Sequence, residues 1–462
     1  MIQDFRHQRV TVIGLGRFGG GVGVTRWLAR AGARVVLTDQ QPAEKLHVAL
    51  EQIRDLDLEL RLGGHDERDS RDADLVVVNP AVRDDSPFVQ AARDAGVPLS
   101  TEINLFVERC PARCVGITGS VGKSTIAAMC GHVLKATLTD RRVWLGGNIG
   151  RSLLDDLPTI RSGDIVVLEL SSFQLHRTPL VRWSPHIAVI TNIRPNHLDW
   201  HGGFAAYLAA KLNIVRFQDP ARDAAVIEDT PELRRNFEHL YGDVAGLWRY
   251  GLDGDEPVAV AQTTSAIDCD DRRLRWENVR LGVPGRHNRL NAAAALTVAH
   301  LLGVPADAAV AAIASYAALP DRLECVAVRH GVTYYNDSKS TTPEAAMTAM
   351  EALAAPLLVI LGGYDKGSDL RAVAEMAARR ARFVACIGQT GSKLTELVRA
   401  AGGIAEFCGE LTTGVEACRR HARAGDTVLL SPACASWDQF DDYRARGAMF
   451  TRLVTSEAPA TA

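Results

Sequence analysis

A short segment around Lys123 most tightly constrains how this 462-residue chain can fold. The apolar run Cys114–Thr118 leads into a glycine-rich turn, and a helical pattern begins at Lys123. Gly122-Lys123-Ser124 is the core of a phosphate-binding loop: amides surround phosphate, the lysine reaches outer oxygens and the hydroxyl ligates magnesium. The strict pattern has glycine where this chain has Ile117, so a chance match is the alternative. The strand–loop–helix context favours an ATP site.

A second glycine-rich turn lies near the N-terminus. The run Gly14–Gly19 (GLGRFG) follows a predicted strand, Arg9–Ile13, and Asp39 ends the next strand. This arrangement is typical of dinucleotide binding, because bare backbone amides and a helix N-terminus attract phosphate. Three alternatives stay open for this turn: an NAD site, a site for another nucleotide, or a domain of this type that holds no ligand.

Three segments of the chain alternate short β-branched runs with helical patterns, which indicates parallel sheets covered by helices. We therefore expect an α/β protein of three domains. A Rossmann-like domain is predicted over residues 1–108, a central domain of the phosphate-loop ATPase type over 109–318, and a second Rossmann-like domain over 319–462. The polar stretch 253–279 is predicted to form a hairpin insertion.

The composition disfavours several classes of protein. Hydrophobic residues make up 47% and charged residues 23%, so long disordered stretches are not expected. The formal net charge is -3 without a Lys/Arg block, which disfavours a nucleic-acid partner. No apolar run approaches the ~18 residues of a membrane span, and the first residues lack the apolar core of a signal peptide. Nine scattered cysteines are typical of reduced thiols, so we expect a cytoplasmic protein, by default a monomer.

A series of polar motifs runs in order through the three segments. They are GGNIG at 146–150, LELSSFQL at 168–175, NHLD at 196–199, AAK at 209–211, GRHNRLN at 285–291, DR at 321–322, NDSKST at 336–341 and SPACASWDQF at 431–440. Together with the two glycine turns, these motifs resemble those of the Mur ligase family. The last motif resembles the branch of the family that adds D-glutamate.

The resemblance implies an ATP-dependent ligase of peptidoglycan synthesis. In this chemistry ATP phosphorylates the carboxylate of UDP-N-acetylmuramoyl-L-alanine, and the amine of D-glutamate attacks the acyl phosphate. Negative charge collects on phosphoryl oxygens, so cations and positioned donors are expected to dominate catalysis. Magnesium, with two ions expected, is the implied cofactor beside ATP.

The resemblance also assigns roles to residues. Lys123, His197 and Lys211 are implied in catalysis, and Lys211 as a carbamate, because captured carbon dioxide supplies the oxygen ligands that magnesium prefers. The implied metal ligands are Ser124, Glu169, His197 and Lys211. The implied ATP-binding residues are Gly119, Ser120, Gly122, Lys123, Ser124, Thr125, Asn291, Arg322 and Asp337. The implied UDP-substrate residues are Leu15, Gly16, Arg17, Asp39, Asn148 and Ser171, and the implied amino-acid residues are Lys339, Thr341, Lys366, Ser436 and Tyr443.

Several assignments have plainer alternatives. Glu169 is otherwise a helix N-cap or a solvated carboxylate, and His197 a surface or satisfied histidine. Lys211 is otherwise an exposed helix lysine, Lys366 a solvated loop lysine, and Asn291, predicted to open a helix, a helix cap. Arg322 and Asp337 are otherwise a structural salt bridge.

The chain also departs from the family pattern at a few positions. Val121 stands where the phosphate loop usually has Asn, and Asn196 precedes His197 where an acid is frequent. Trp437 and Tyr443 replace an aliphatic residue and Phe near the implied amino-acid pocket.

Three other functions stay open on sequence grounds. Another Mur ligase or a folylpolyglutamate-synthase-like enzyme would keep the reaction type and change the substrate. A nucleotide-sensing regulator would keep the fold and lose the chemistry, but the joint presence of Lys123, Glu169, His197 and Lys211 argues against it. An NAD-dependent oxidoreductase would leave the phosphate-binding loop unexplained.

Overall fold

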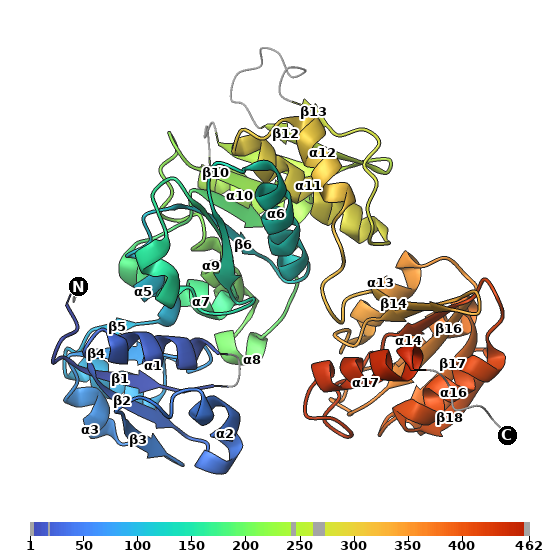
Figure 1. Ribbon diagram of the computed structural model, residues 1–462, viewed down its shortest axis with the longest axis horizontal. Coiled ribbons are helices and arrows are strands. Elements are labelled where there is room, and N and C mark those ends of the chain that lie inside the picture. Colours follow the sequence, from blue (N-terminus) through green and yellow to red (C-terminus); the bar gives the residue numbers. More distant parts are fainter. Residues whose placement is uncertain (1–3, 17–18, 242–245, 262–272, 457–462) are drawn as a thin grey trace. The chain divides into compact units, whose positions relative to one another are not determined.

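Three β-sheets organise the chain, and helices pack against each of them (Figure 1). The computed structural model describes residues 4–16, 19–241, 246–261 and 273–456. The chain divides into two compact units. One comprises Met1–Asn278 with Asn291–Ala312, and the other Val279–Leu290 with Ile313–Ala462.

The N-terminal sheet is parallel, in the order β3-β2-β1-β4-β5. Its strands are β1 (Arg9–Ile13), β2 (Arg34–Asp39), β3 (Glu59–Leu62), β4 (Leu75–Val78) and β5 (Leu99–Ser100). Its helices are α1 (Gly20–Arg30), α2 (Ala43–Glu51), α3 (Glu67–Arg71), α4 (Pro87–Asp94) and α5 (Glu102–Val107). The strand order reverses between β1 and β4, and ligands of such sheets bind at the carboxyl ends of the strands where this happens.

The central sheet has the order β13-β12-β11-β10-β9-β6-β8-β7, parallel from β7 to β11. Its parallel strands are β6 (Arg113–Thr118), β7 (Val143–Gly147), β8 (Ile165–Glu169), β9 (Ile187–Ile190), β10 (Ala224–Glu228) and β11 (Leu247–Asp253). Its helices are α6 (Lys123–Thr137), α7 (Ser172–Arg177), α8 (Leu198–His201), α9 (Phe204–Leu212), α10 (Pro231–Tyr241), α11 (Arg286–Leu301) and α12 (Ala306–Ala314), with 3-10 turns η1 (Leu154–Thr159) and η2 (Thr178–Val181). Two antiparallel strands, β12 (Glu256–Ala261) and β13 (Arg273–Arg275), extend the sheet within the predicted hairpin region, and residues 262–272 lie outside the described part.

The C-terminal sheet has the order β14-β15-β19-β16-β17-β18, and only the edge strand β14 is antiparallel to its neighbour among the described strands. Its strands are β14 (Glu324–Arg329), β15 (Val332–Asn336), β16 (Leu357–Gly362), β17 (Ala381–Ile387), β18 (Ala405–Gly409) and β19 (Thr427–Leu430). Its helices are α13 (Pro343–Ala352), α14 (Arg371–Arg380), α15 (Gly391–Ala400), α16 (Leu411–His421) and α17 (Tyr443–Thr455).

The prediction of an α/β protein built on parallel sheets is confirmed, with antiparallel strands added at the edges. The middle strands β8, β9 and β16 are buried along their whole length, as their unbroken apolar runs require. The predicted boundaries near residues 108 and 318 stay predictions. Within the described ranges, no helix combines the length and the apolar character needed to cross a membrane.

Candidate active site

Two glycines shape the turn between β6 and α6. Gly122 precedes α6 with a φ of 91°, and Gly119 has a φ of 146°, both in the region that favours glycine. A Cβ on Gly119 would lie 1.7 Å from the Oγ1 of Thr191, at the end of β9. The turn therefore brings the N-terminus of α6 beside the carboxyl ends of β6 and β9, and the positive end of a helix attracts anions.

We expect Gly119→Ala to destabilise the central domain by about 2–4 kcal/mol, because the added methyl group collides with Thr191 and the φ is unfavourable for alanine. Thermal unfolding measures the effect. Gly163→Ala is the matched control, since a Cβ there meets nothing within 4 Å and Gly163 lacks a positive φ. Equal melting of the two variants would contradict this account of the turn.

Two lysines donate to one carbonyl oxygen in this turn. The Lys123 Nζ donates to the Gly119 and Ser120 oxygens at 2.9 and 3.0 Å, and the Lys211 Nζ donates to the same Gly119 oxygen at 2.8 Å. Lys211 is 2% exposed. Burial first, and then the charge of Lys123, lower the pKa of Lys211 to about 6, although Glu169 acts in the opposite direction. The Lys211 amine is therefore largely uncharged at neutral pH, and the alternative of an exposed helix lysine is wrong.

The carboxylate of Glu169 ends β8 and is 2% exposed. Its Oε1 accepts a hydrogen bond from the Asn148 Nδ2 at 3.0 Å, whereas its Oε2 is buried without a hydrogen-bond partner in the structure. A buried carboxylate oxygen without a partner is costly, and a bound cation would relieve the cost. The alternative of a solvated carboxylate is wrong.

The residues at this strand end fit magnesium. Ser124, in the first turn of α6, is buried and offers a hydroxyl oxygen, and Glu169 offers an unpartnered carboxylate oxygen. Magnesium usually takes one or two oxygen ligands from the protein and fills its other positions with water and phosphate oxygens. Across the described residues, no group of three or more His, Cys, Asp or Glu side chains could hold a metal ion.

His197 precedes α8 with a φ of 52°, and its ring packs on Phe173 with centroids 4.8 Å apart. Burial of the ring lowers the pKa of His197 although the residue as a whole is exposed. Asp199 acts in the opposite direction, whereas Lys123, and Lys211 when it is protonated, lower the pKa of His197 further. The structure thus brings the three predicted catalytic residues within electrostatic reach of one another, with the imidazole favoured in its neutral form.

Asn291 reaches the same turn from α11. A Cβ on Gly122 would lie 2.9 Å from the Asn291 Oδ1. The prediction that Asn291 opens a helix is wrong, because α11 begins at Arg286 and Asn291 lies in its second turn. Its side chain is therefore a neighbour of the phosphate-binding loop and not a helix cap.

The N-terminal glycine turn is held by Asp39. One carboxylate oxygen accepts from the amides of Leu15 and Gly16 at 2.9 and 3.4 Å, and the other accepts from the Gln41 amide at 2.8 Å. The Asp39 carboxylate therefore fixes the conformation of the glycine turn. Arg17 lies outside the described residues.

Two further polar side chains in this unit make structural hydrogen bonds. Asn79, which the sequence analysis missed, donates from its Nδ2 to the Gly14 oxygen at 3.3 Å. Ser171 caps α7 in a reciprocal arrangement with Gln174, so its hydroxyl has a structural task.

In the other unit, two predicted amino-acid-binding lysines lie over aromatic rings. The Lys339 Nζ is 5.0 Å from the Tyr443 ring, and the Lys366 Nζ is 4.7 Å from the Trp437 ring. The Tyr364 amide donates to the Ala435 oxygen at 2.9 Å and ties the loop of Lys366 to the loop that carries buried Ser436. The amide of Thr341, which lies in the loop after β15, donates to the Lys339 oxygen at 2.9 Å. These residues therefore gather at the carboxyl ends of β15, β16 and β19.

Asp337 directly follows β15 and is 5% exposed. Its carboxylate accepts from the Leu323 amide at 3.1 Å and from the Ser431 hydroxyl at 2.8 Å. Burial raises the pKa of Asp337 to about 6, and the charge of Arg322 acts in the opposite direction. The carboxylate is thus fixed by a backbone amide and a hydroxyl.

Arg446 is a residue that sequence reasoning missed. It lies on α17, is 1% exposed, and donates to the Ser338 oxygen at 2.9 Å and to the Cys434 oxygen at 3.1 Å. A single guanidinium thereby joins the loop of Lys339 to the loop of Ser436. An arginine in a helical pattern normally indicates a solvated face, so no local signal marks this one.

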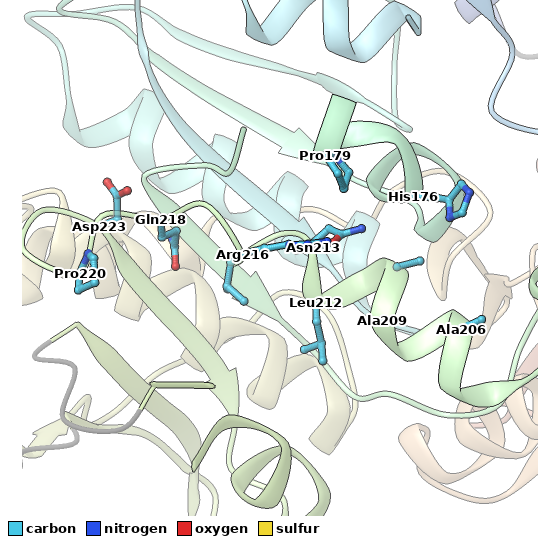
Figure 2. Close-up of a pocket in the computed structure, with 12 residues that line it drawn as sticks. His176, Pro179, Ala206, Ala209, Leu212, Asn213, Arg216, Gln218, Pro220 and Asp223 are labelled. Carbon is cyan, nitrogen blue, oxygen red and sulfur yellow. The ribbon is translucent and has the colours of Figure 1, made fainter. Parts of the chain in front are cut away.

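A separate cavity of about 740 Å³ lies beside α9 (Figure 2). Ala206, Ala209 and Leu212 line it from the helix, and Arg216 and Asp223 line it from the loop that follows. Its lining residues come from α7, η2, α9 and residues 213–223, so the cavity does not coincide with the phosphate-binding loop.

Known protein families match successive segments of the chain. Three family models match the chain: the Mur ligase MurD-like N-terminal domain over residues 8–101, the Mur ligase middle domain over 117–299, and the Mur ligase glutamate ligase domain over 321–434. A UDP-N-acetylmuramoylalanine--D-glutamate ligase from Symbiobacterium thermophilum is 36% identical, over 97% of this chain and 98% of that protein. A protein of the same name from Roseiflexus sp. (strain RS-1) is also 36% identical, with the same two coverages.

Solved structures share the fold. The UDP-N-acetylmuramate-alanine ligase MurC from Thermotoga maritima has a TM-score of 0.58 at 20% identity, covering 96% of this chain and 99% of that one. The MurF ligase from Thermotoga maritima, in complex with ADP, has a TM-score of 0.56 at 18% identity, covering 98% and 96%. At these identities the likeness establishes the fold alone.

Proposed function

This chain belongs to the Mur ligase family, and we propose that it uses ATP to join D-glutamate to UDP-N-acetylmuramoyl-L-alanine. The observation that carries the proposal is the arrangement around the phosphate-binding loop. Lys123 and Lys211 meet at the Gly119 oxygen, His197 is within their electrostatic reach, and Glu169 holds a buried oxygen without a partner. Relatives that carry the name of this activity align with nearly the whole chain.

In the first step the carboxylate of the UDP substrate attacks the outer phosphorus of ATP, forming an acyl phosphate and releasing ADP. The first amides of α6 and the ammonium of Lys123 stabilise the charge that collects on the phosphoryl oxygens. Ser124 and Glu169 would hold magnesium, with His197 for a second ion, and magnesium would neutralise phosphate charge. Residues Gly119, Ser120, Gly122, Thr125, Asn291, Arg322 and Asp337 complete the proposed ATP site.

Lys211 is proposed to act as a carbamate. An uncharged, buried amine can add to carbon dioxide and lose a proton, which gives an anion with two oxygen ligands. The lowered pKa of Lys211 supports this, because an ammonium has no lone pair for the addition. The carbamate would also place a negative charge beside the ammonium of Lys123.

In the second step the amine of D-glutamate attacks the acyl carbon, and phosphate leaves. Lys339, Lys366, Thr341, Ser436 and Tyr443 are proposed to bind the two carboxylates of the amino acid, as ammonium and hydroxyl donors suit carboxylate oxygens. Leu15, Gly16, Arg17, Asp39, Asn148 and Ser171 are proposed for the UDP substrate. A monomer in the cytoplasm without a nucleic-acid partner remains our prediction, and sedimentation velocity would test the monomer.

Phosphate release tests the proposed function. Protein, ATP, magnesium and UDP-N-acetylmuramoyl-L-alanine are mixed with D-glutamate, L-glutamate, L-lysine or no amino acid. Release with D-glutamate alone is expected, and Lys123→Ala should lower it by about 10³-fold. Lys135→Ala is the matched control, because Lys135 lies on the same helix and is exposed.

The other outcomes are equally informative. Release with a different amino acid would move the chain to another branch of the family and direct attention to Trp437 and Tyr443. Folded protein that releases phosphate with none of them would favour the nucleotide-sensing alternative.

A further inference from the structure

The short helix that follows His197 buries none of its residues. Helix α8 is four residues long, has no buried residue and begins without a side-chain cap. The chain turns through positive φ at both ends, 52° at His197 and 77° at Gly202. So short a helix is unstable unless outside contacts hold it. Contacts from elsewhere must therefore set the position of His197.

The N-terminal domain supplies two such contacts through residues 79–85, which follow β4. The Trp200 Nε1 on α8 donates to the Ala81 oxygen at 2.9 Å. In the opposite direction, a terminal nitrogen of Arg83 donates to the Asp199 oxygen at 2.8 Å. Two hydrogen bonds thus join loop 79–85 to α8, one donated by the helix and one donated by the loop.

The same loop is anchored to α7. The Asp84 carboxylate accepts from the His176 Nε2 and from Arg177, both at 2.8 Å. Arg177 is 3% exposed and also donates to the Val82 oxygen at 2.8 Å. The hydrogen bond from His176, and then the charge of Arg177, hold the pKa of Asp84 far below its usual range against the effect of burial. The loop is therefore a firm support for α8.

Trp200 and His197 pack against the same aromatic ring, that of Phe173. The Phe173 ring lies 4.9 Å from the Trp200 ring and 4.8 Å from the His197 ring, centroid to centroid. A shift of Trp200 therefore disturbs the surface on which the imidazole rests.

The other end of the loop rests on the N-terminal glycine turn. The Asn79 Nδ2 donates to the Gly14 oxygen, and the Asn79 Oδ1 accepts from the Ala81 amide at 3.1 Å. A continuous set of contacts thus runs from the glycine turn through Asn79 and Ala81 to Trp200.

We propose that loop 79–85 positions His197, with Trp200 and Arg83 as positioning residues, so that the N-terminal glycine turn is mechanically coupled to the catalytic histidine. This inference rests on the proposed function, in which the glycine turn binds the UDP substrate and His197 serves the phosphoryl transfer.

Two variants cut the contacts and keep an aromatic or apolar side chain at each position. Trp200→Phe keeps an aromatic ring beside Phe173 and loses the N–H that reaches Ala81. Arg83→Met loses the bond to the Asp199 oxygen, together with an exposed ion pair to Asp85 that contributes little. Each should lower kcat about tenfold with an unchanged KM for ATP. In a His197→Ala background, Trp200→Phe should cause no further loss, because its effect passes through His197.

Amide hydrogen exchange provides a readout that does not depend on activity. Exchange of residues 198–203 should be about five- to tenfold faster in Trp200→Phe and Arg83→Met, with unchanged melting. Trp248→Phe, whose ring packs against His300, is the control for the same chemical change and should leave exchange at 198–203 and kcat unaltered.

Unchanged exchange in both variants would overturn the inference, and so would faster exchange with normal kcat or a further loss in the His197→Ala background. A wild-type protein without ligase activity would sink the proposed function instead, and the exchange experiment would still decide whether loop 79–85 holds α8.

Discussion

Lys211→Met is expected to abolish ligase activity and to leave the protein at least as stable as the wild type. Methionine preserves the length and burial of the side chain but can neither form a carbamate nor carry a charge. Removal of a catalytic anion beside transferring phosphate should lower kcat by about 10²–10³-fold or more. Lys135→Met, at an exposed position on α6, should change neither activity nor melting.

The stability of the wild type should depend on pH in a defined direction. The folded pKa of Lys211 is about 6, whereas the unfolded value is roughly 10.4. Between these values the unfolded chain binds more protons, so the free energy of unfolding rises with pH. The advantage of Lys211→Met in melting temperature should therefore be largest near pH 6 and shrink toward pH 9, in buffer stripped of carbon dioxide. A constant difference across this range would contradict the lowered pKa.

Removing and restoring carbon dioxide distinguishes a carbamate on Lys211 from other roles of this lysine. Stripping it should lower the activity of the wild type, and bicarbonate should restore that activity. Activity that is indifferent to bicarbonate, in an enzyme that still needs Lys211, would leave the lysine essential as an amine and remove the carbamate from the mechanism.

What the sequence predicts well is local. The turn around Lys123 follows from a strand, three adjacent residues and a helix, and the structure has strand β6 and helix α6 where the pattern places them. Helix α11, which the sequence predicts to open at Asn291, begins five residues earlier, at Arg286. Its first turn consists of Arg286, His287, Asn288 and Arg289, so the apolar pattern that indicates a helix begins only at Leu290.

The sequence does not predict hairpin β14–β15, because its turn lacks the usual residue pair. Its turn, His330-Gly331, has positive φ at both residues, as tight hairpins need, but it is not one of the Asn-Gly or Asp-Gly pairs that announce such a turn.

Contacts between distant segments could not be predicted from the pattern. Trp200 and Ala81 are 119 positions apart, and Ser338 and Arg446 are 108 apart. Nothing in the residues around Trp200 or Arg446 distinguishes them from ordinary helix positions. The candidate catalytic side chains could be named from the sequence because they sit in motifs, whereas the residues that hold them in place are defined only by the packing of the folded chain.

Arg446 offers the sharpest test of that distinction, because its buried guanidinium joins two loops of the predicted amino-acid site. The Nε donates to the Ser338 hydroxyl at 3.0 Å, and one terminal nitrogen donates to the oxygens of Cys434 and Ala435 at 3.2 Å each. Burial lowers the pKa of Arg446 to about 10, so the group stays charged at neutral pH. Arg446→Met would remove the guanidinium that donates to the buried oxygens of Ser338 and Cys434, at a cost of about 2–4 kcal/mol in the free energy of unfolding.

The same change should raise the KM for D-glutamate by more than about tenfold, because Lys339 and Ser436 directly follow Ser338 and Ala435, whose oxygens Arg446 holds. The KM for the UDP substrate should hardly change, since its proposed residues lie in the other compact unit. Arg452→Met, at an exposed position on the same helix, is the control and should match the wild type. Arg446→Lys should fall between the two, because one ammonium cannot reach both loops as the branched guanidinium does. Equal KM values for D-glutamate in Arg446→Met and Arg452→Met would mean that Arg446 contributes to the stability of the fold and not to the binding of D-glutamate.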